Sequence, residues 1–230
     1  MLVKDIRHIF AKKFQYKEFK GDTIDINGAS FLCDERTIFG KRNEDYINAE
    51  IAWYESEDCN VNKLFEIYGK EVKIWKDICD DNGFVNSQYG YLVFSEHNHD
   101  QYNNCFNALV NDPNTRQAIM IYTRPEMHYE STDNGRYDFT CTNAVHYYIN
   151  GKWLDVVVQM RSNDAVFGYN NDYAWQRYVQ QCLLENINEY RYENDQDELE
   201  LGTIRWQVGS LHVYKRHFHL LEEYVERYLK

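Results

Sequence analysis

The sequence contains only two prolines among its 230 residues, and it has no long uninterrupted apolar run. A membrane-spanning helix needs about 18–20 consecutive apolar residues, so we expect no membrane segment. Stretches rich in proline, glycine and serine, which mark linkers and low-complexity regions, are also missing. We therefore expect a single domain over residues 1–230, long enough to bury a core.

Metal-binding and disulfide patterns are missing as well. The six cysteines form no C-x-x-C pair, and no carboxylate or cysteine spacing completes a metal site around the histidines. We expect no metal and free thiols in a reducing cytoplasm. The N-terminal stretch has the pattern of an amphipathic helix and not of a secretory leader. The cysteines are Cys33, Cys59, Cys79, Cys105, Cys141 and Cys182.

Positive charge is in short supply. Lysine and arginine number 25 against 37 aspartates and glutamates, which gives a formal net charge of −12. A broad nucleic-acid-binding surface is strongly basic, so this composition argues against one. Any anion that the protein binds must be held by a few local arginines.

Periodic patterns indicate both helices and strands. Apolar residues recur at helical spacing in 102–110, 175–182 and 221–228. Residues 118–123 have strand character, and 203–214 predict a strand pair or one bent strand. Residues 138–150 alternate up to Asn150-Gly151, which predicts a hairpin with the next strand. The mixture predicts an α+β fold with a layered mixed sheet flanked by helices, and not a doubly wound parallel sheet.

Glu50 is the first residue that fits poorly in a simple core. Together with Ile47, Ile51 and Tyr54 it falls at i, i+3, i+4 and i+7, so its carboxylate follows an apolar helical stripe. Burying a carboxylate costs several kcal/mol unless it is paired or protonated. One interpretation places Glu50 at the edge of the stripe, in water. The other buries it, which would raise its pKa toward a range useful for proton transfer.

Cys141 lies in the middle of a predicted strand. A lone cysteine on an apolar strand face is more often inert core than a nucleophile. A reactive thiol needs a nearby cation to lower its pKa. Counting back from the Asn150-Gly151 turn places Arg161 opposite Thr140 to Cys141, which would supply that cation.

The segment "RSNDAVFGYNND" (161–172) surrounds an apolar Val-Phe pair with charged groups. Asp172 could be the N-cap of a helix that begins at Tyr173. That interpretation leaves Arg161 and Ser162 unexplained, since the end of a strand is a good position for side chains that bind a phosphate.

These motifs together resemble the thymidylate synthase superfamily. The similar segments are "DFTCTNAVHYYI" (138–149), "RSNDAVFGYNND", "GSLHVYKRH" (209–217) and "IWKDICDDNGFVNSQYG" (74–90). They occur in the family's order over nearly the whole chain. The resemblance implies a thymidylate synthase-like fold that uses a sheet face for dimerisation. It also implies a homodimer in which Arg116 reaches the partner's phosphate site.

Within the superfamily, the sequence is most similar to the phage branch that hydroxymethylates deoxycytidylate. Members that act on uracil carry asparagine four residues after the glycine that corresponds to Gly168, where this chain has Asp172. A carboxyl group that shares a proton can accept from the N4 amino group of cytosine and donate to N3. Asp172 therefore favours dCMP over dUMP.

The resemblance also assigns roles to individual residues. The Cys141 thiolate would add to C6 of the base, and 5,10-methylenetetrahydrofolate would supply the one-carbon unit, with Glu50 organising protons and water. Asp164 would lie near the ring and the folate, and Trp75 would line the folate pocket. Phosphate and sugar would contact Arg161, Ser162, His212 and Tyr214.

Two features qualify the resemblance. Gln117 replaces the second of two adjacent arginines, which would weaken phosphate binding unless Arg124 compensates. The printed chain ends at Lys230 without the long tail that closes synthases over folate, which favours addition of water. The alternatives are a hydroxymethylase that acts on CMP, a synthase that acts on uracil, and a nucleotide-binding protein without catalysis. A phage nucleotide-synthesis complex in the host cytoplasm is a further implied setting.

Overall fold

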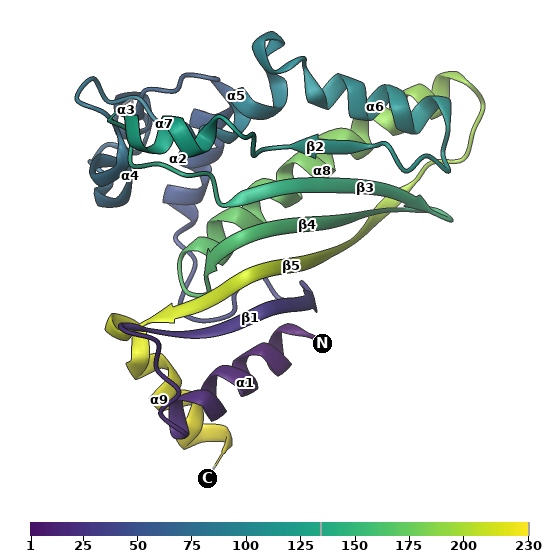
Figure 1. Ribbon diagram of the computed structural model, residues 1–230. Coiled ribbons are helices and arrows are strands. Elements are labelled where there is room, and N and C mark those ends of the chain that lie inside the picture. Colours follow the sequence, from purple (N-terminus) through teal and green to yellow (C-terminus); the bar gives the residue numbers. More distant parts are fainter. Residues whose placement is uncertain (134, 230) are drawn as a thin grey trace.

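Five strands form one sheet. They are β1 (Thr23–Leu32), β2 (Ile119–Ile121), β3 (Thr142–Asn150), β4 (Trp153–Asp164) and β5 (Glu200–Tyr214). The computed structural model describes residues 1–133 and 135–229, and it places the strands in the order β1-β5-β4-β3-β2 (Figure 1). β4 and β5 run parallel, and the other neighbouring pairs are antiparallel. The predicted mixed sheet is confirmed.

Helices pack against the sheet and beyond its edges. They are α1 (Val3–Gln15), α2 (Glu44–Glu55), α3 (Val61–Tyr68), α4 (Lys73–Ile78), α5 (Tyr89–Phe94), α6 (Gln101–Asn111), α7 (Met127–Asp133), α8 (Gly168–Glu193) and α9 (Phe218–Tyr228), with 3-10 turns at Glu96–Asn98 and Lys215–His217. α8 crosses one face of the sheet, and α1 and α9 lie beyond β1 (Figure 1). α2, α3, α4 and α7 gather beyond the end where β3 begins. The periodic segments of the sequence correspond to α6, α8 and α9.

The predicted hairpin joins β3 to β4. Asn150 pairs with Trp153 across the turn. Gly151 has a φ of 62°, in the left-handed region that two-residue hairpin turns require and that glycine adopts at little cost.

One detail of the strand prediction is wrong. The alternation places Cys141 within a strand, but β3 begins one residue later, and a register shift between Thr142 and Ala144 interrupts the alternation. A shift of this kind changes which face the side chains take. Of the two alternatives predicted for residues 203–214, the single strand is confirmed, because they belong to the continuous strand β5, which pairs with β4 on one side and β1 on the other.

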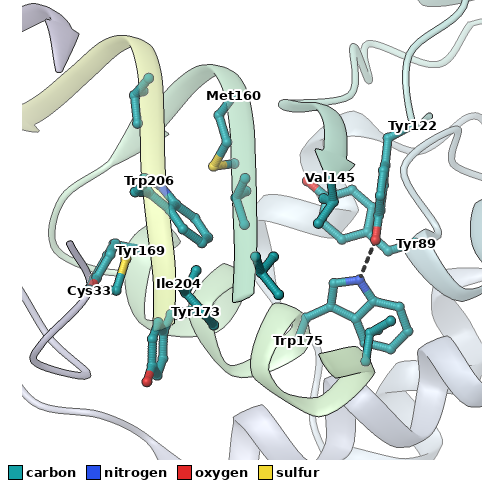
Figure 2. Close-up of a cluster of buried hydrophobic side chains, with 14 of the residues drawn as sticks. Cys33, Tyr89, Tyr122, Val145, Met160, Tyr169, Tyr173, Trp175, Ile204 and Trp206 are labelled. Carbon is teal, nitrogen blue, oxygen red and sulfur yellow. Dashed lines mark hydrogen bonds between the residues drawn. The ribbon is translucent and has the colours of Figure 1, made fainter. Parts of the chain in front are cut away.

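The core lies between the sheet and α8. Trp206, Met160 and Val145 from the sheet meet Tyr169 and Trp175 from α8 (Figure 2). Each large apolar side chain stabilises the fold by roughly 1.5–3 kcal/mol when fully buried. This packing fixes the start of α8 against the ends of β4 and β5.

Among the described residues, no helix is both long enough and apolar enough to span a membrane.

Candidate functional site

Cys141 and Arg161 face each other where β3 begins and β4 nears its end. The Arg161 backbone N–H donates to the Cys141 carbonyl at 2.9 Å. The Arg161 guanidinium donates from Nε to the Thr140 carbonyl at 3.0 Å and lies 3.6 Å from the Cys141 Sγ. The predicted pairing is therefore confirmed. On the other side of β4, Gly209 lets β5 approach Arg161 closely, because a Cβ there would lie 2.8 Å from the Arg161 carbonyl oxygen.

Two opposing effects act on the Cys141 thiol. Burial raises its pKa to about 11, whereas the charge of Arg161 lowers it and the carboxylates of Asp172 and Asp138 raise it further. Burial dominates, so the free protein holds a protonated thiol at neutral pH. Arg161 is the nearby cation that favours the thiolate.

A buried aspartate that the sequence did not single out anchors the Cys141 segment. The Asp138 carboxylate accepts from the backbone N–H groups of Asn86 and Ser87 at 2.8 and 2.6 Å, and from the Ser87 hydroxyl at 2.6 Å. On the other side, the Thr142 hydroxyl bonds to the Tyr89 hydroxyl at 3.0 Å. The backbone around Cys141 is thus fixed from both sides.

Glu50 is buried, with only 6% of its surface exposed, so its placement at the water-facing edge is wrong. The Tyr46 hydroxyl donates to its carboxylate through a short hydrogen bond. The Trp75 indole N–H lies 2.8 Å from the Tyr46 hydroxyl and 3.3 Å from Glu50 Oε1. Burial raises the Glu50 pKa to about 7, although both hydrogen bonds lower it. Glu50 can therefore exchange protons near neutral pH.

Asp172 lies inside α8, which begins at Gly168, so its interpretation as the N-cap is wrong. Its Oδ2 accepts from the Asn163 side-chain amide at 2.7 Å. Burial raises the pKa of Asp172 to about 8, and the charges of Glu50 and Asp164 raise it too, whereas the Asn163 hydrogen bond lowers it. The site thus contains two carboxyl groups that retain protons close to neutral pH.

The ends of β4 and β5 carry the other predicted polar side chains side by side. Ser162 pairs with Ser210 and Asp164 with His212 in the parallel ladder. Asp164 also stabilises the entry to α8, because its carboxylate accepts from the backbone N–H of Val166 at 3.0 Å. The rings of His212 and Tyr214 lie 4.8 Å apart between centroids.

A pocket of about 360 Å³ adjoins this site. Tyr46, Ile74 and Phe167 give it apolar surface, and Ile74 and Phe167 are both more than half exposed. Lys41 and Lys70 add positive charge. The pocket therefore suits an aromatic ring system that carries acidic groups.

Two other arginines were predicted to bind phosphate. Arg116 is exposed and precedes β2 by three residues, and because β2 runs antiparallel to β3, the start of β2 lies away from the end of the sheet where β3 begins (Figure 1). Arg124 lies nearer that end, since the backbone N–H of Thr123 donates to the Asn143 carbonyl at 3.2 Å, but its guanidinium forms an ion pair with Glu130 at 2.7 Å. Within one chain, Arg161 is thus the predicted phosphate-binding arginine that lies beside Cys141.

Sequence reasoning missed Tyr46, Asn163 and Asp138. Tyr46 carried a detectable signal, since it precedes Glu50 by one helical turn and its hydroxyl can donate to a buried carboxylate. The partners of Asn163 and Asp138 are distant in the sequence, so no local pattern reveals them.

Comparison with known proteins places these features in context. The profile of the thymidylate synthase family matches residues 40–230. The deoxycytidylate 5-hydroxymethyltransferase of Enterobacteria phage T4 is 43% identical over 229 residues, which cover 97% of this chain and 91% of that protein. The thymidylate synthase of Bacillus mojavensis is 25% identical over 172 residues, which cover 72% of this chain and 56% of the synthase. The structure of a thermostable thymidylate synthase A from Bacillus subtilis shares the fold, with a TM-score of 0.71 and 21% identity over 99% of this chain and 84% of that one.

Proposed function

This chain belongs to the thymidylate synthase family, and from that premise we propose that it is a deoxycytidylate 5-hydroxymethyltransferase. It would convert dCMP, 5,10-methylenetetrahydrofolate and water into 5-hydroxymethyl-dCMP and tetrahydrofolate. The observation that carries the proposal is a partly buried carboxyl group, Asp172, whose pKa is raised to about 8 at the position expected to contact the base. The proposal is also supported by the phage T4 protein that is 43% identical to this chain and is named for this activity.

Asp172 supports cytosine as the base of the substrate, because cytosine and uracil differ in their hydrogen-bond donors and acceptors. Cytosine presents an N4 amino donor beside an N3 acceptor, whereas uracil presents an O4 acceptor beside an N3–H donor. A protonated carboxyl offers one acceptor and one donor, and it complements cytosine when its proton lies on the oxygen that faces N3. The raised pKa of Asp172 keeps that proton available at neutral pH, and the same proton would stabilise N3 when attack on the ring makes N3 more basic.

Cys141 would act as the nucleophile. Its thiolate bonds to C6, which makes C5 nucleophilic, and C5 then bonds to the one-carbon unit that the folate supplies. Loss of the C5 proton and departure of tetrahydrofolate leave an exocyclic methylene, to which water adds. Release of the thiolate restores the aromatic ring. Glu50, with its pKa raised to about 7, would exchange protons with this water and with the ring.

The strand ends supply groups for the rest of the nucleotide. Arg161 and Ser162 would bind the phosphate, and His212 and Tyr214 would bind the sugar hydroxyl. Because Arg116 lies away from Cys141 in its own chain, it would contribute only in a homodimer, by reaching the partner's phosphate site. The ion pair of Arg124 with Glu130 argues against its compensating for Gln117.

The folate would occupy the pocket beside Tyr46. The exposed Ile74 and Phe167 offer apolar surface to its ring systems, and Lys41 and Lys70 offer positive charge to its glutamate carboxylates. Trp75, which bonds to Tyr46, would support the wall of this pocket, and Asp164 would contact the ring at its inner end.

The proposal is tested by supplying methylenetetrahydrofolate with dCMP, CMP or dUMP in separate reactions and weighing the nucleotide products by mass spectrometry. A gain of one CH₂O on dCMP alone is expected. The same gain on CMP would extend the substrate to ribonucleotides. A gain of CH₂ on dUMP, with dihydrofolate formed, would make the protein a thymidylate synthase. No product from any nucleotide would leave a binding protein without catalysis.

A further inference from the structure

Asn163 connects the hydrophobic core to the base-reading carboxyl group. Its side chain is buried on β4, next to the start of α8. The indole N–H of Trp206, which has no exposed surface, donates to Asn163 Oδ1 at 3.2 Å. The Asn163 Nδ2 group donates to Asp172 Oδ2 at 2.7 Å. A chain of two hydrogen bonds therefore runs from the core of the sheet to Asp172.

The donor at one end fixes the direction of the whole chain. An indole nitrogen can only donate, so the Asn163 oxygen must face Trp206 and the amide NH₂ group must face Asp172. Gly168 lies against this contact, since a Cβ there would be 3.1 Å from Asn163 Nδ2 and 3.7 Å from Asp172 Oδ2. A flipped amide would leave the buried indole N–H without its acceptor, which costs a factor of about 5 to 150 in population.

A carboxyl group without such a partner is ambiguous. It can bind cytosine with its proton on one oxygen, and it can bind uracil with the proton on the other oxygen. A fixed N–H donor removes this freedom, because an oxygen that accepts from Asn163 is the less favourable site for the proton. The proton of Asp172 then stays on Oδ1.

We propose that Asn163 is a positioning residue that makes Asp172 selective for cytosine. It holds Oδ2 as the acceptor for the exocyclic N4 amino group and leaves Oδ1 as the donor to ring N3. This inference rests on the proposed function and deepens it, since it names the group that separates dCMP from dUMP. The hydrogen bond from Asn163 also lowers the pKa of Asp172, against the effect of burial.

The test compares equilibrium binding of dCMP and dUMP to the full-length protein by titration calorimetry at pH 7. We expect Asn163→Ala to lower the ratio of dCMP affinity to dUMP affinity about 2- to 10-fold, the range for a hydrogen bond between uncharged groups, because Asp172 is protonated at this pH. Trp206→Phe keeps a large ring but removes the indole N–H, so it should lower the same ratio by a smaller factor. If Asn163→Ala does not fold, the affinity ratio of Trp206→Phe tests the inference by itself.

Asn188→Ala is the matched control. The Asn188 amide also makes one donor and one acceptor bond, both to Leu199, at 2.9 and 2.8 Å, but at the opposite end of α8. Its affinity ratio should equal that of the wild type. An equal loss of both affinities in Asn163→Ala would show a merely structural role and overturn the inference. So would a stronger preference for dCMP, because that would mean that the two oxygens face the base the other way round.

Failure of this inference can be distinguished from failure of the proposed function. A wild-type protein that forms no 5-hydroxymethyl-dCMP refutes the proposed function, whatever the variants bind. A wild-type enzyme that forms it, with an unchanged affinity ratio in both variants, overturns the role of Asn163 alone.

Discussion

The two ends of β3, β4 and β5 are built from the same strands but differ in chemistry (Figure 1). At one end, Cys141 precedes β3, and β4 and β5 end at Asp164 and Tyr214. At the opposite end, Gly151 turns the chain between β3 and β4, and an ion pair joins the exposed Lys152 and Glu200.

Burial accounts for the difference between the two ends. At the Cys141 end, Glu50 of α2, Asp172 of α8 and the Cys141 thiol are withdrawn from water, and burial raises the pKa of each. At the hairpin end, the ion pair stays in water. The Cys141 end is thus arranged for proton exchange at a cost in stability, whereas the hairpin end only connects the strands.

The largest expected effect follows from removing the thiol. Cys141→Ser should lower kcat for dCMP about 10⁴-fold or more, because a hydroxyl is a far weaker nucleophile at neutral pH. The Kd for dCMP, measured by titration calorimetry, should stay within a few-fold of the wild type. Residual turnover above about one tenth of the wild-type rate would show that Cys141 does not form the adduct.

Glu50→Gln should have the next largest effect. Glutamine keeps an acceptor for the Tyr46 hydroxyl but cannot exchange a proton, so kcat should fall about 10²- to 10⁴-fold. The pH profile of kcat/KM is the sharper readout. The wild type should show a transition near pH 7, where Glu50 titrates, and the variant should lack it. A transition that persists unchanged would assign it to another group.

Asp172→Asn should increase stability while it impairs turnover of dCMP. The pKa of Asp172 is about 8 in the folded protein against an ordinary value of 3.8. Between these values the folded protein retains a proton that the unfolded chain has released, so stability is lost as the pH rises. The ceiling is about 1.4 kcal/mol for each pH unit.

The asparagine variant avoids this loss, and its side-chain oxygen can still accept from Asn163. Urea unfolding at pH 5, 6.5 and 8 should therefore give a free-energy advantage over the wild type that grows with pH, to at least about 1 kcal/mol at pH 8. If the difference in free energy of unfolding between the variant and the wild type were the same at all three pH values, Asp172 would have its ordinary pKa in the folded protein.

The smallest effect belongs to the hairpin end. Both members of the Lys152–Glu200 ion pair are about half exposed, at 58% and 51% of their side-chain surface. Such pairs contribute about 0–1 kcal/mol, so Lys152→Ala should change the free energy of unfolding by less than that and leave kcat/KM unchanged. A tenfold loss of activity would break the contrast between the two ends.

Local patterns were enough to predict much of the fold. The helical spacing in α6, α8 and α9 and the Asn150-Gly151 turn depend on residues that are close in sequence. The strand boundary at Cys141 was wrong because a register shift depends on the partner strand. The N-cap assigned to Asp172 was wrong because α8 begins earlier, after Asp164 has already bonded to the backbone of the turn.

The candidate site was only partly predictable for a similar reason. The pairing of Arg161 with Cys141 follows from counting residues across a hairpin, and the structure bears it out. The contact of Asn163 with Trp206 could not be counted in this way, because β4 and β5 are joined through α8 and the register of a parallel pair is not fixed by a short turn.

The position of β5 between β1 and β4 has a consequence for how the chain reaches this structure. β2, β3 and β4 can pair soon after they are synthesised. β1 pairs with β5, so Asp25 can take its place opposite His212 only after β5 has been synthesised. Contacts between segments so far apart in sequence slow folding. During synthesis, β1 and one edge of β4 stay unpaired until residues 200–214 emerge. The proposed sugar-binding residues His212 and Tyr214 also lie on β5. The nucleotide site should therefore be completed at the same late stage of synthesis as the pairing of β1 and β4 with β5.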